Sequence, residues 1–285
     1  MAGYRFAQDI ATAVAPTLPD FSVEVVEAID STNTELMRRA RAGDVAPVLL
    51  VAERQTAGRG RLGRPWQSAQ DDAAQPLSLT FSIGLPLAPR DWSGLSLAVG
   101  ASVAESLDPG GLAGIRIKWP NDLWTGDDRK LAGILIETAS AVAAGQRGAA
   151  ASAAMRHLVI GIGVNIGPRS AAGLRAPPAW LHEWQPASNA ADALRAIAAP
   201  LVRDVVAFGA SGFAPFASRF AARDALRGRE VEFSDGTTGR CEGVGASGEL
   251  RVATADGLRA VTSSEVSVRP RGSVEPGSSA GAAPS

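Results

Sequence analysis

Residues 52–66 read AERQTAGRGRLGRPW, and this stretch says more about the chain than any other. It holds four arginines and three glycines, and no acidic residue occurs from Arg54 to Gln70. Glycine lets the backbone adopt positive φ and lets a ligand approach the main chain. Arginine supplies planar forks of donors that suit carboxylate and phosphate oxygens. The stretch therefore predicts a flexible basic loop that closes over an anion; the alternative is an ordinary solvated basic loop.

The same glycines match the dinucleotide-binding pattern G-x-G-x-x-G, at Gly58, Gly60 and Gly63. That pattern requires a helix that begins within the glycines, so that its N-terminus faces a pyrophosphate. Here Arg64-Pro65-Trp66 and then a polar run follow, and no apolar period of 3.6 residues begins. A Rossmann-type dinucleotide site is therefore not expected.

Lysine is scarce in this chain. Among 28 lysine and arginine residues, only Lys118 and Lys130 are lysines, and both lie in the short segment 117–137. A lysine ammonium is a compact charge on a thin stem, which a guanidinium does not mimic. The pair points to a place where this shape is needed.

Composition sets the class of protein. The chain has 285 residues, is 46% hydrophobic and carries a net charge of −1, so it has no overall attraction to nucleic acid or anionic membranes. The single Cys241 suits a reducing compartment, and His157 and His182 lack partners at metal-ligand spacing. No signal peptide and no apolar run of ~18 residues is evident. We expect a cytoplasmic globular protein, monomeric or weakly dimeric, without DNA or membrane partners.

Hydrophobic periodicity and turn residues predict the order of elements. Residues 1–20 show little pattern. A capping box at Thr32 and Glu35 opens a helix that Gly43 closes, and Asn121-Asp122 is expected in a turn. Strands are predicted at 22–29, 48–52, 77–83, 115–118, 131–137 and 157–165, and further helices at 91–107, 189–208 and 213–224. Residues 139–154 are of low complexity and are predicted to form an exposed loop.

The character of the chain changes after Arg227-Gly228. About five short strands are predicted between Glu230 and Val268, separated by turns at Asp235-Gly236, Ser247-Gly248 and Asp256-Gly257. This pattern predicts a small barrel. The predicted division is a catalytic domain at 1–226, a barrel at 227–270 and a disordered tail at 271–285.

Five segments together carry a family resemblance. They are Ser31-Thr32-Asn33; Gln55 with Gly58-Arg59-Gly60-Arg61-Leu62-Gly63-Arg64-Pro65-Trp66; Lys118-Trp119-Pro120-Asn121-Asp122; Arg129-Lys130-Leu131-Ala132-Gly133-Ile134-Leu135; and Gly161-Ile162-Gly163-Val164-Asn165. In this order and spacing the chain resembles biotin protein ligase over about residues 22–268. The resemblance implies an α+β fold: a mixed sheet flanked by helices, like that of class II synthetases, followed by an SH3-like barrel.

The resemblance also implies a reaction in two steps. Biotin and ATP give biotinyl-5′-AMP and pyrophosphate, and a lysine of a biotin carboxyl carrier protein domain then attacks the acyl carbon. Because two anions must meet in the first step, cations are needed to offset their repulsion. By resemblance, Arg59 and Arg61 contact ligand and phosphates, and Lys130 reaches the biotin carboxylate and the α-phosphate. Asp122 corresponds to an acid near the nucleotide and magnesium.

Other positions are implied to bind the two substrates. Those matched to contacts with the ureido ring of biotin are Ser31, Thr32, Asn33 and Gln55, although Ser31 and Thr32 could instead cap a helix. Trp66 packs over adenine or anchors its loop, and Asn165 lies near the nucleotide or simply ends a strand. The predicted binding set is completed by Gly58, Gly60, Lys118, Asn121 and Gly133. Asn121-Asp122 could alternatively form only a turn.

The sequence departs from the family pattern in places. Residues 68–76 and 139–154 are unusual insertions, and the glycine–asparagine pair often found near the first of them is missing. Only 21 residues precede Ser22, too few for the DNA-binding domain of members that double as repressors, so a ligase-only form is expected. Two alternatives stay open: a lipoate-type ligase, and a biotin- or nucleotide-binding protein without catalysis.

Overall fold

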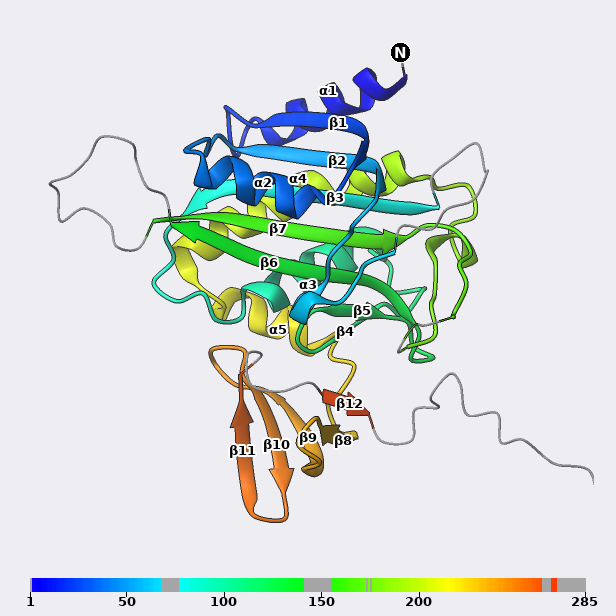
Figure 1. The fold of residues 1–285 in the computed structure, drawn as a ribbon. Coiled ribbons are helices and arrows are strands. Elements are labelled where there is room, and N and C mark those ends of the chain that lie inside the picture. The colour runs from blue at the N-terminus through cyan, green and yellow to red at the C-terminus, as the bar shows by residue number, and fades with distance from the viewer. Residues whose placement is uncertain are drawn as a thin grey trace, which may run out of the picture.

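The computed structural model describes residues 2–67, 77–140, 155–172, 174, 176–262 and 268–270. Its centre is a seven-stranded sheet in the order β1-β2-β3-β7-β6-β5-β4 (Figure 1). The strands are β1 (Ser22–Ile29), β2 (Val48–Gln55), β3 (Ser78–Leu87), β4 (Arg116–Lys118), β5 (Asp122–Trp124), β6 (Lys130–Ser140) and β7 (Arg156–Asn165). Strands β1 and β2 are parallel, whereas the pairs β2–β3, β3–β7, β7–β6, β6–β5 and β5–β4 are antiparallel. The predicted mixed sheet is confirmed.

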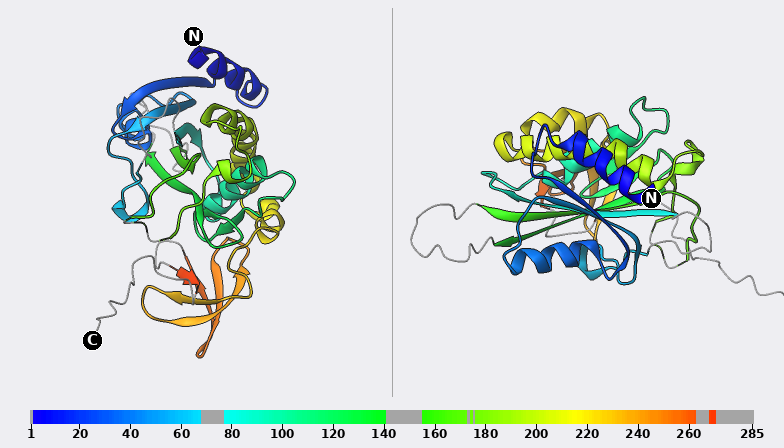
Figure 2. Two further views of the ribbon diagram at one scale, coloured as in Figure 1. Left: turned by 90° about the vertical axis from the view of Figure 1, so that its right-hand side faces the viewer. Right: turned by 90° about the horizontal axis from the view of Figure 1, so that it is seen from above.

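Helices cover both faces of this sheet (Figure 2). On one face α2 (Thr32–Arg41) packs on the sheet through Leu36, Met37 and Ala40. On the other face lie α1 (Ala2–Val14), α3 (Leu95–Leu107) and α4 (Ala190–Ser211), with α5 (Ala217–Ala221) against α3. The larger hydrophobic core lies on this second face. The face that α2 covers holds only a smaller cluster of buried apolar side chains.

Side-chain alternation explains why the two faces differ. In β7 the residues Leu158, Ile160, Ile162 and Val164 point into the larger core, and the intervening positions include Gly161, Gly163 and Asn165. Strand β3 behaves in the same way, with Leu79, Phe81, Ile83 and Leu85 in the core and Ser78, Thr80, Ser82 and Gly84 on the other side. Successive residues of a strand face opposite ways, so small and polar residues collect on the α2 face.

The C-terminal strands form a second, antiparallel sheet in the order β11-β10-β9-β8-β12 (Figure 1). They are β8 (Glu230–Phe233), β9 (Thr238–Val244), β10 (Leu250–Thr254), β11 (Gly257–Val261) and β12 (Val268–Pro270). The arrangement is consistent with the predicted small barrel. The predicted turns at Asp235-Gly236 and Ser247-Gly248 fall between its strands, whereas in the third pair Asp256 lies in a turn and Gly257 begins β11. Its buried side chains, among them Val231 and Phe233, join the same core as α3 and β7.

Several local predictions were wrong. Residues 2–14, read as patternless, form α1, because Phe6, Ile10 and Val14 recur every four residues and pack on the core. The N-cap of α2 is Ser31 rather than Thr32, since the Ser31 hydroxyl accepts a hydrogen bond from Thr34 N. Residues 213–224 hold a 3-10 turn, Ala214–Phe216, and the short α5 instead of one long helix.

One further prediction is corrected, and others are untested. Asp122 begins β5, so only Asn121 of the predicted pair lies in the turn. The insertion at 68–76, most of the predicted loop at 139–154 and the predicted tail at 271–285 lie outside the described residues.

Candidate functional site

The strand pairing places one row of small side chains across the α2 face of the sheet. The paired positions are Ala52, Thr80, Gly163, Gly133, Asp122 and Lys118, from β2 to β4. Residues directly opposite each other in antiparallel strands share a face. The row is therefore a floor of small residues that ends in two opposite charges.

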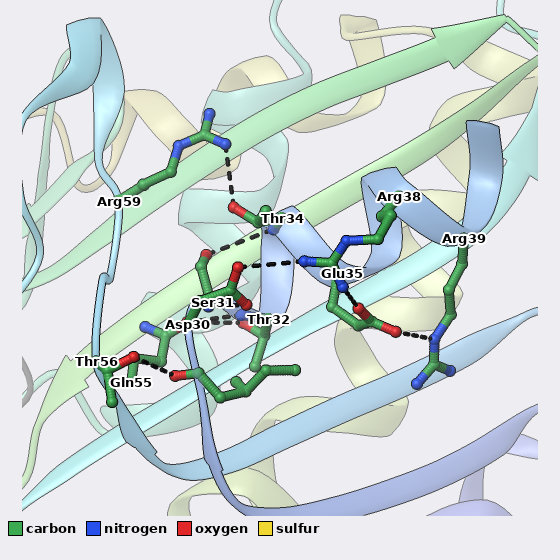
Figure 3. Close-up of polar contacts among 11 residues, drawn as sticks. Asp30, Ser31, Thr32, Thr34, Glu35, Arg38, Arg39, Gln55, Thr56 and Arg59 are labelled. Carbon is green, nitrogen blue, oxygen red and sulfur yellow. Dashed lines mark hydrogen bonds and ion pairs between the residues drawn. The ribbon is translucent and has the colours of Figure 1, made fainter. Parts of the chain in front are cut away.

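A chain of polar side chains borders this floor. Gln55 Oε1 accepts from Thr32 N at 2.8 Å and from Thr32 Oγ1 at 3.2 Å (Figure 3). The Thr32 and Ser82 hydroxyl oxygens are 2.7 Å apart, and Ser82 Oγ donates to Asn33 Oδ1 at 2.6 Å. The three side chains Thr32, Asn33 and Ser82 are almost fully buried. This cluster exists because parallel β1 and β2 end at the same edge, which brings the start of α2 beside Gln55.

The polar chain continues to the Gly/Arg loop, residues 54–67. Asn33 Nδ2 donates to Glu137 Oε2 at 3.0 Å, and Glu137 Oε1 forms an ion pair with Arg59 at 2.7 Å. Arg59 also donates to Thr34 Oγ1 at 3.2 Å (Figure 3). Arg59 and Glu137 are partly exposed, so the pair contributes about 0–1 kcal/mol and can exchange for contacts with a ligand.

The Gly/Arg loop folds as a narrow hairpin over the site. Gly60 N donates to Arg64 O at 2.7 Å, and Trp66 N donates to Gly58 O at 2.8 Å. A side chain at position 58 would stand 2.4 Å from Trp66 O, so this crossing needs glycine. Gly63 adopts φ +71°, which glycine tolerates. A one-turn 3-10 helix, Arg61–Gly63, stands where a dinucleotide site would require the start of an α-helix.

Two glycines of β7 act as slots for side chains of the site. A Cβ at Gly161 would lie 2.2 Å from Asn33 Oδ1, and a Cβ at Gly163 would lie 2.4 Å from the Trp66 ring. The Trp66 ring also approaches the position of a Cβ at Gly133, at 3.5 Å. The role of Trp66 as an anchor of its loop is therefore visible in the contacts.

The seating of Trp66 can be tested by adding one methyl group. Gly163→Ala is expected to lift the Trp66 ring, because overpacking of this kind costs about 1–3 kcal/mol. The open loop should be cleaved by trypsin after Arg59 or Arg61 roughly five- to a hundredfold faster. Gly126→Ala is the control, since nothing lies within 4 Å of its added Cβ. Equal cleavage of both variants would show that Trp66 does not hold the loop.

Cations gather at the charged end of the floor. Lys130 Nζ lies 2.7 Å from Asp122 Oδ1. Arg61 Nη1 donates to Asn121 Oδ1 at 3.2 Å, and Asn121 Nδ2 donates to Ile134 O at 2.7 Å. Burial lowers the pKa of Arg61 from its usual range, although Asp122 opposes the shift. The arrangement suits an anionic ligand.

Lys118 completes this group. Its ammonium lies 5.7 Å from the centre of the Trp124 ring, within cation–π range. Burial, together with the nearby positive charges of Lys130 and Arg61, lowers the pKa of Lys118 to about 8, and the negative charge of Asp122 opposes this shift. A nearby anion would favour the charged form again.

Asn165 supports the backbone of Lys130. Its side chain, 3% exposed, donates from Nδ2 to Lys130 O at 3.1 Å and to Ala179 O at 2.9 Å. Lys130 N donates to Pro177 O at 2.7 Å. Asn165 therefore does more than end a strand.

The structure gathers the predicted residues into one region and adds others. Thr32, Asn33 and Gln55 border the floor, Gly58, Gly60 and Trp66 shape the loop over it, and Lys118, Asp122 and Lys130 lie at its charged end. Ser31 serves as the helix cap. Prediction missed Ser82, Glu137 and Arg169. The sequence gives only a weak signal for the first two: Ser82 alternates with apolar residues along β3, and Glu137 follows the apolar run of β6.

Magnesium has no ready-made ligand set here. Within the described ranges, no group of three His, Cys, Asp or Glu side chains is arranged to hold a metal ion. Asp122, the predicted ligand, is bonded to Lys130. Magnesium is often held by one or two carboxylates together with substrate phosphates and water. Asp122 fits such a shared role only.

Comparison with known proteins agrees with this geometry. Residues 25–165 match the biotin/lipoate A/B protein ligase family. The bifunctional ligase/repressor BirA of Escherichia coli is 35% identical over 241 residues, which cover 81% of this chain and 69% of BirA. The chain belongs to the biotin protein ligase family. This ligase is also 29% identical to the biotin–[acetyl-CoA-carboxylase] ligase of Paracoccus denitrificans, over 83% of the chain and 96% of that protein.

A solved structure shares the fold of this ligase. The biotin protein ligase from Aquifex aeolicus, in complex with biotin and ATP, superposes with a TM-score of 0.70 at 26% identity. The match covers 87% of this chain and 98% of that one. No helix within the described part of the ligase is long and apolar enough to cross a membrane.

Proposed function

We propose that the chain activates biotin with ATP, forming biotinyl-5′-AMP and pyrophosphate, and then transfers biotin to a lysine of a biotin carboxyl carrier protein domain. The observation that carries this proposal is the floor of small residues, bordered by neutral polar groups on one side and by Lys118, Lys130 and Arg61 on the other. Biotin has the same polarity, with a neutral ureido ring and an anionic carboxylate.

The neutral border suits the ureido ring. Its N–H groups and carbonyl require both acceptors and donors, which Gln55, Thr32 and Asn33 offer through amide and hydroxyl groups. These groups are already ordered by mutual hydrogen bonds, so little side-chain entropy remains to be lost on binding. The valeryl chain would then run over the floor toward Gly133.

The charged end suits the adenylation step. A carboxylate oxygen of biotin bonds to the α-phosphorus, while the bond from that phosphorus to the bridging oxygen breaks and pyrophosphate leaves. Lys130, held by Asp122, lies beside Gly133, where the carboxylate would end. Lys118 and Arg61 add positive charge, which reduces repulsion between carboxylate and triphosphate. Asp122 could also share a magnesium ion with the phosphates.

The second step requires that the intermediate be kept from water. A mixed anhydride hydrolyses unless water is excluded, and a loop that covers the site provides this. The Gly/Arg loop is placed to do so, because it crosses the floor and seats Trp66 against Gly163. The Trp66 indole nitrogen is buried without a hydrogen-bond partner among the described residues, which leaves it able to donate to a ligand. The amine of the carrier lysine then attacks the acyl carbon and AMP leaves.

One incubation tests the function. The protein, ATP and either labelled biotin or labelled lipoate are mixed, with and without a purified carrier domain. Biotin-dependent pyrophosphate release, followed by labelling of the carrier domain, is expected. Labelling with lipoate instead would make it a lipoate-type ligase. Binding of biotin without pyrophosphate release would make it a non-catalytic binding protein.

The lowered pKa of Lys118 predicts a pH dependence. Below pH 8 the free enzyme carries a charged Lys118, and this charge is lost as pH rises through about 8. The KM for ATP is therefore expected to rise up to tenfold per pH unit above 8, because binding must take up one proton. Lys118→Arg should remove this dependence, since arginine stays charged. A KM that is flat from pH 7 to 9.5 in the wild type would contradict the role of Lys118.

A further inference from the structure

Arg169 joins three parts of the molecule that are separate in the sequence. It lies beyond the end of β7 and was not among the residues predicted to form the site. Its Nη1 donates to Asn165 Oδ1 at 2.6 Å, and its Nη2 donates to Gln67 O at 3.0 Å. The guanidinium carbon also lies 5.5 Å from the centre of the Trp66 ring. Arg169 therefore holds the closing end of the Gly/Arg loop.

The same contacts lead onward to Lys130. Asn165 Nδ2 donates to Lys130 O, which also accepts from Ala179 N at 2.9 Å. An asparagine amide can turn over, which would point its oxygen at the Lys130 and Ala179 carbonyls. Arg169 opposes this turn, because a guanidinium can donate to Oδ1 but cannot accept from Nδ2. The orientation of Asn165, and with it the brace on Lys130, depends on Arg169.

The hydrogen-bond partners of Arg169 are neutral groups. Among the described residues no carboxylate forms an ion pair with Arg169, and burial lowers the pKa of its guanidinium from the usual range. Its hydrogen bonds go to an amide oxygen and a backbone carbonyl instead. The two donors used lie on different nitrogens of one planar fork, an arrangement that lysine cannot reproduce.

We propose that Arg169 is a positioning residue that couples closure of the Gly/Arg loop to the placement of Lys130. When the loop is closed, Arg169 contacts Gln67 O and the Trp66 ring on one side and Asn165 Oδ1 on the other. These contacts keep Asn165 Nδ2 directed at Lys130 O. When the loop opens, Arg169 loses its contacts with Gln67 and Trp66, and the brace on Lys130 loosens. The effect of this coupling on catalysis rests on the proposed adenylation. The coupling itself is a shared set of hydrogen bonds and does not depend on that function.

Kinetics of the full chain give the first test. Arg169→Met is expected to raise the KM for ATP roughly tenfold, the usual effect of losing a hydrogen bond to a charged group. Arg169→Lys should fall between the wild type and Arg169→Met, because its ammonium reaches one acceptor. The Kd for biotin should change much less than the KM for ATP in both variants, since the contacts of Gln55, Thr32 and Asn33 at the neutral end of the floor are untouched. Arg156→Met is the control, as Arg156 is an exposed arginine at the opposite end of β7.

Hydrogen exchange gives a test that needs no activity. In Arg169→Met, the amides of Lys130 and Ala179 should exchange faster, together with those of residues 58–66, whereas β1 keeps its protection. Unchanged exchange at Lys130 and Ala179, with a wild-type KM for ATP, would overturn the coupling. A general rise in exchange with loss of biotin binding would overturn it too, because Arg169 would then serve stability alone. If the wild type fails to adenylate biotin, the proposed function fails, but the exchange result still decides the coupling.

Discussion

Lys130→Arg is expected to slow formation of biotinyl-5′-AMP about ten- to a hundredfold although it preserves the charge. Lys130 Nζ lies 2.7 Å from Asp122 and only 3.3 Å from the position of a Cβ at Gly133. A guanidinium is wider than an ammonium and is planar, so it cannot occupy this place without moving its neighbours. A displaced hydrogen bond to a charged group costs about 1.5–3 kcal/mol. The measurement is the rate of pyrophosphate release at saturating biotin and ATP.

The control for this variant is a substitution between arginine and lysine at an exposed position. Arg116→Lys changes an exposed residue on β4 and should leave the rate unchanged. Both variants should melt within a few degrees of the wild type, because neither opens a cavity. Wild-type pyrophosphate release by Lys130→Arg would show that the position needs charge alone.

Gly248→Val changes a residue of the C-terminal sheet region, and we expect it to weaken adenylation at the candidate site. Gly248 lies in the turn between β9 and β10 with φ +81°, and its carbonyl accepts from the fully buried indole of Trp119 at 3.1 Å. An added Cβ would stand 2.8 Å from the Gly94 Cα at the start of α3. Because Trp119 directly follows Lys118, moving this turn should shift Lys118 as well. We expect the KM for ATP to rise tenfold or more, in addition to about 1–3 kcal/mol of lost stability from backbone strain.

A substitution at a second turn glycine distinguishes the effect of backbone strain from the effect of the lost contact with Trp119. Gly236, in the turn between β8 and β9, has φ +84°, and nothing lies within 4 Å of its added Cβ. Gly236→Val should therefore lose similar stability from strain but keep the wild-type KM for ATP. If the two variants have the same KM, the second sheet does not act on the site through Trp119.

Local sequence patterns predicted the strands well but said less about how they meet. The run from His157 to Asn165 identifies a buried strand by its apolar residues alone, and β7 confirms it. The contact of Thr32 with Gln55 depends on parallel pairing of β1 and β2, a long-range feature that no short window reveals. The family resemblance predicted that both residues belong to the site, but only the fold shows that they are hydrogen-bonded to each other.

The missed residues have the same explanation. Ser82 is one of several polar residues that alternate with apolar ones along β3, and Glu137 follows the apolar run of β6. The sequence does not show that both lie within reach of Asn33. Helix α1 was missed for a different reason, because three apolar residues spaced by four are a weak signal until α4 and β1 supply a surface to pack on. The capping error arose since Ser31 and Thr32 both suit an N-cap, and tertiary bonds to Gln55 and Ser82 decided between them.

The two-sided character of β3 and β7 has a consequence for inherited variation. Along these strands, we expect alternate positions to be constrained differently. Leu79, Phe81, Ile160 and Ile162 should be constrained by thermal stability, and Thr80, Ser82, Gly161 and Gly163 by the proposed activity. In a saturation-mutagenesis library selected at two temperatures, tolerance should oscillate with a period of two residues. Variants at the first set should be rescued by cooling, and variants at the second should not. Temperature-sensitive variants are therefore expected at every other position along β3 and along β7.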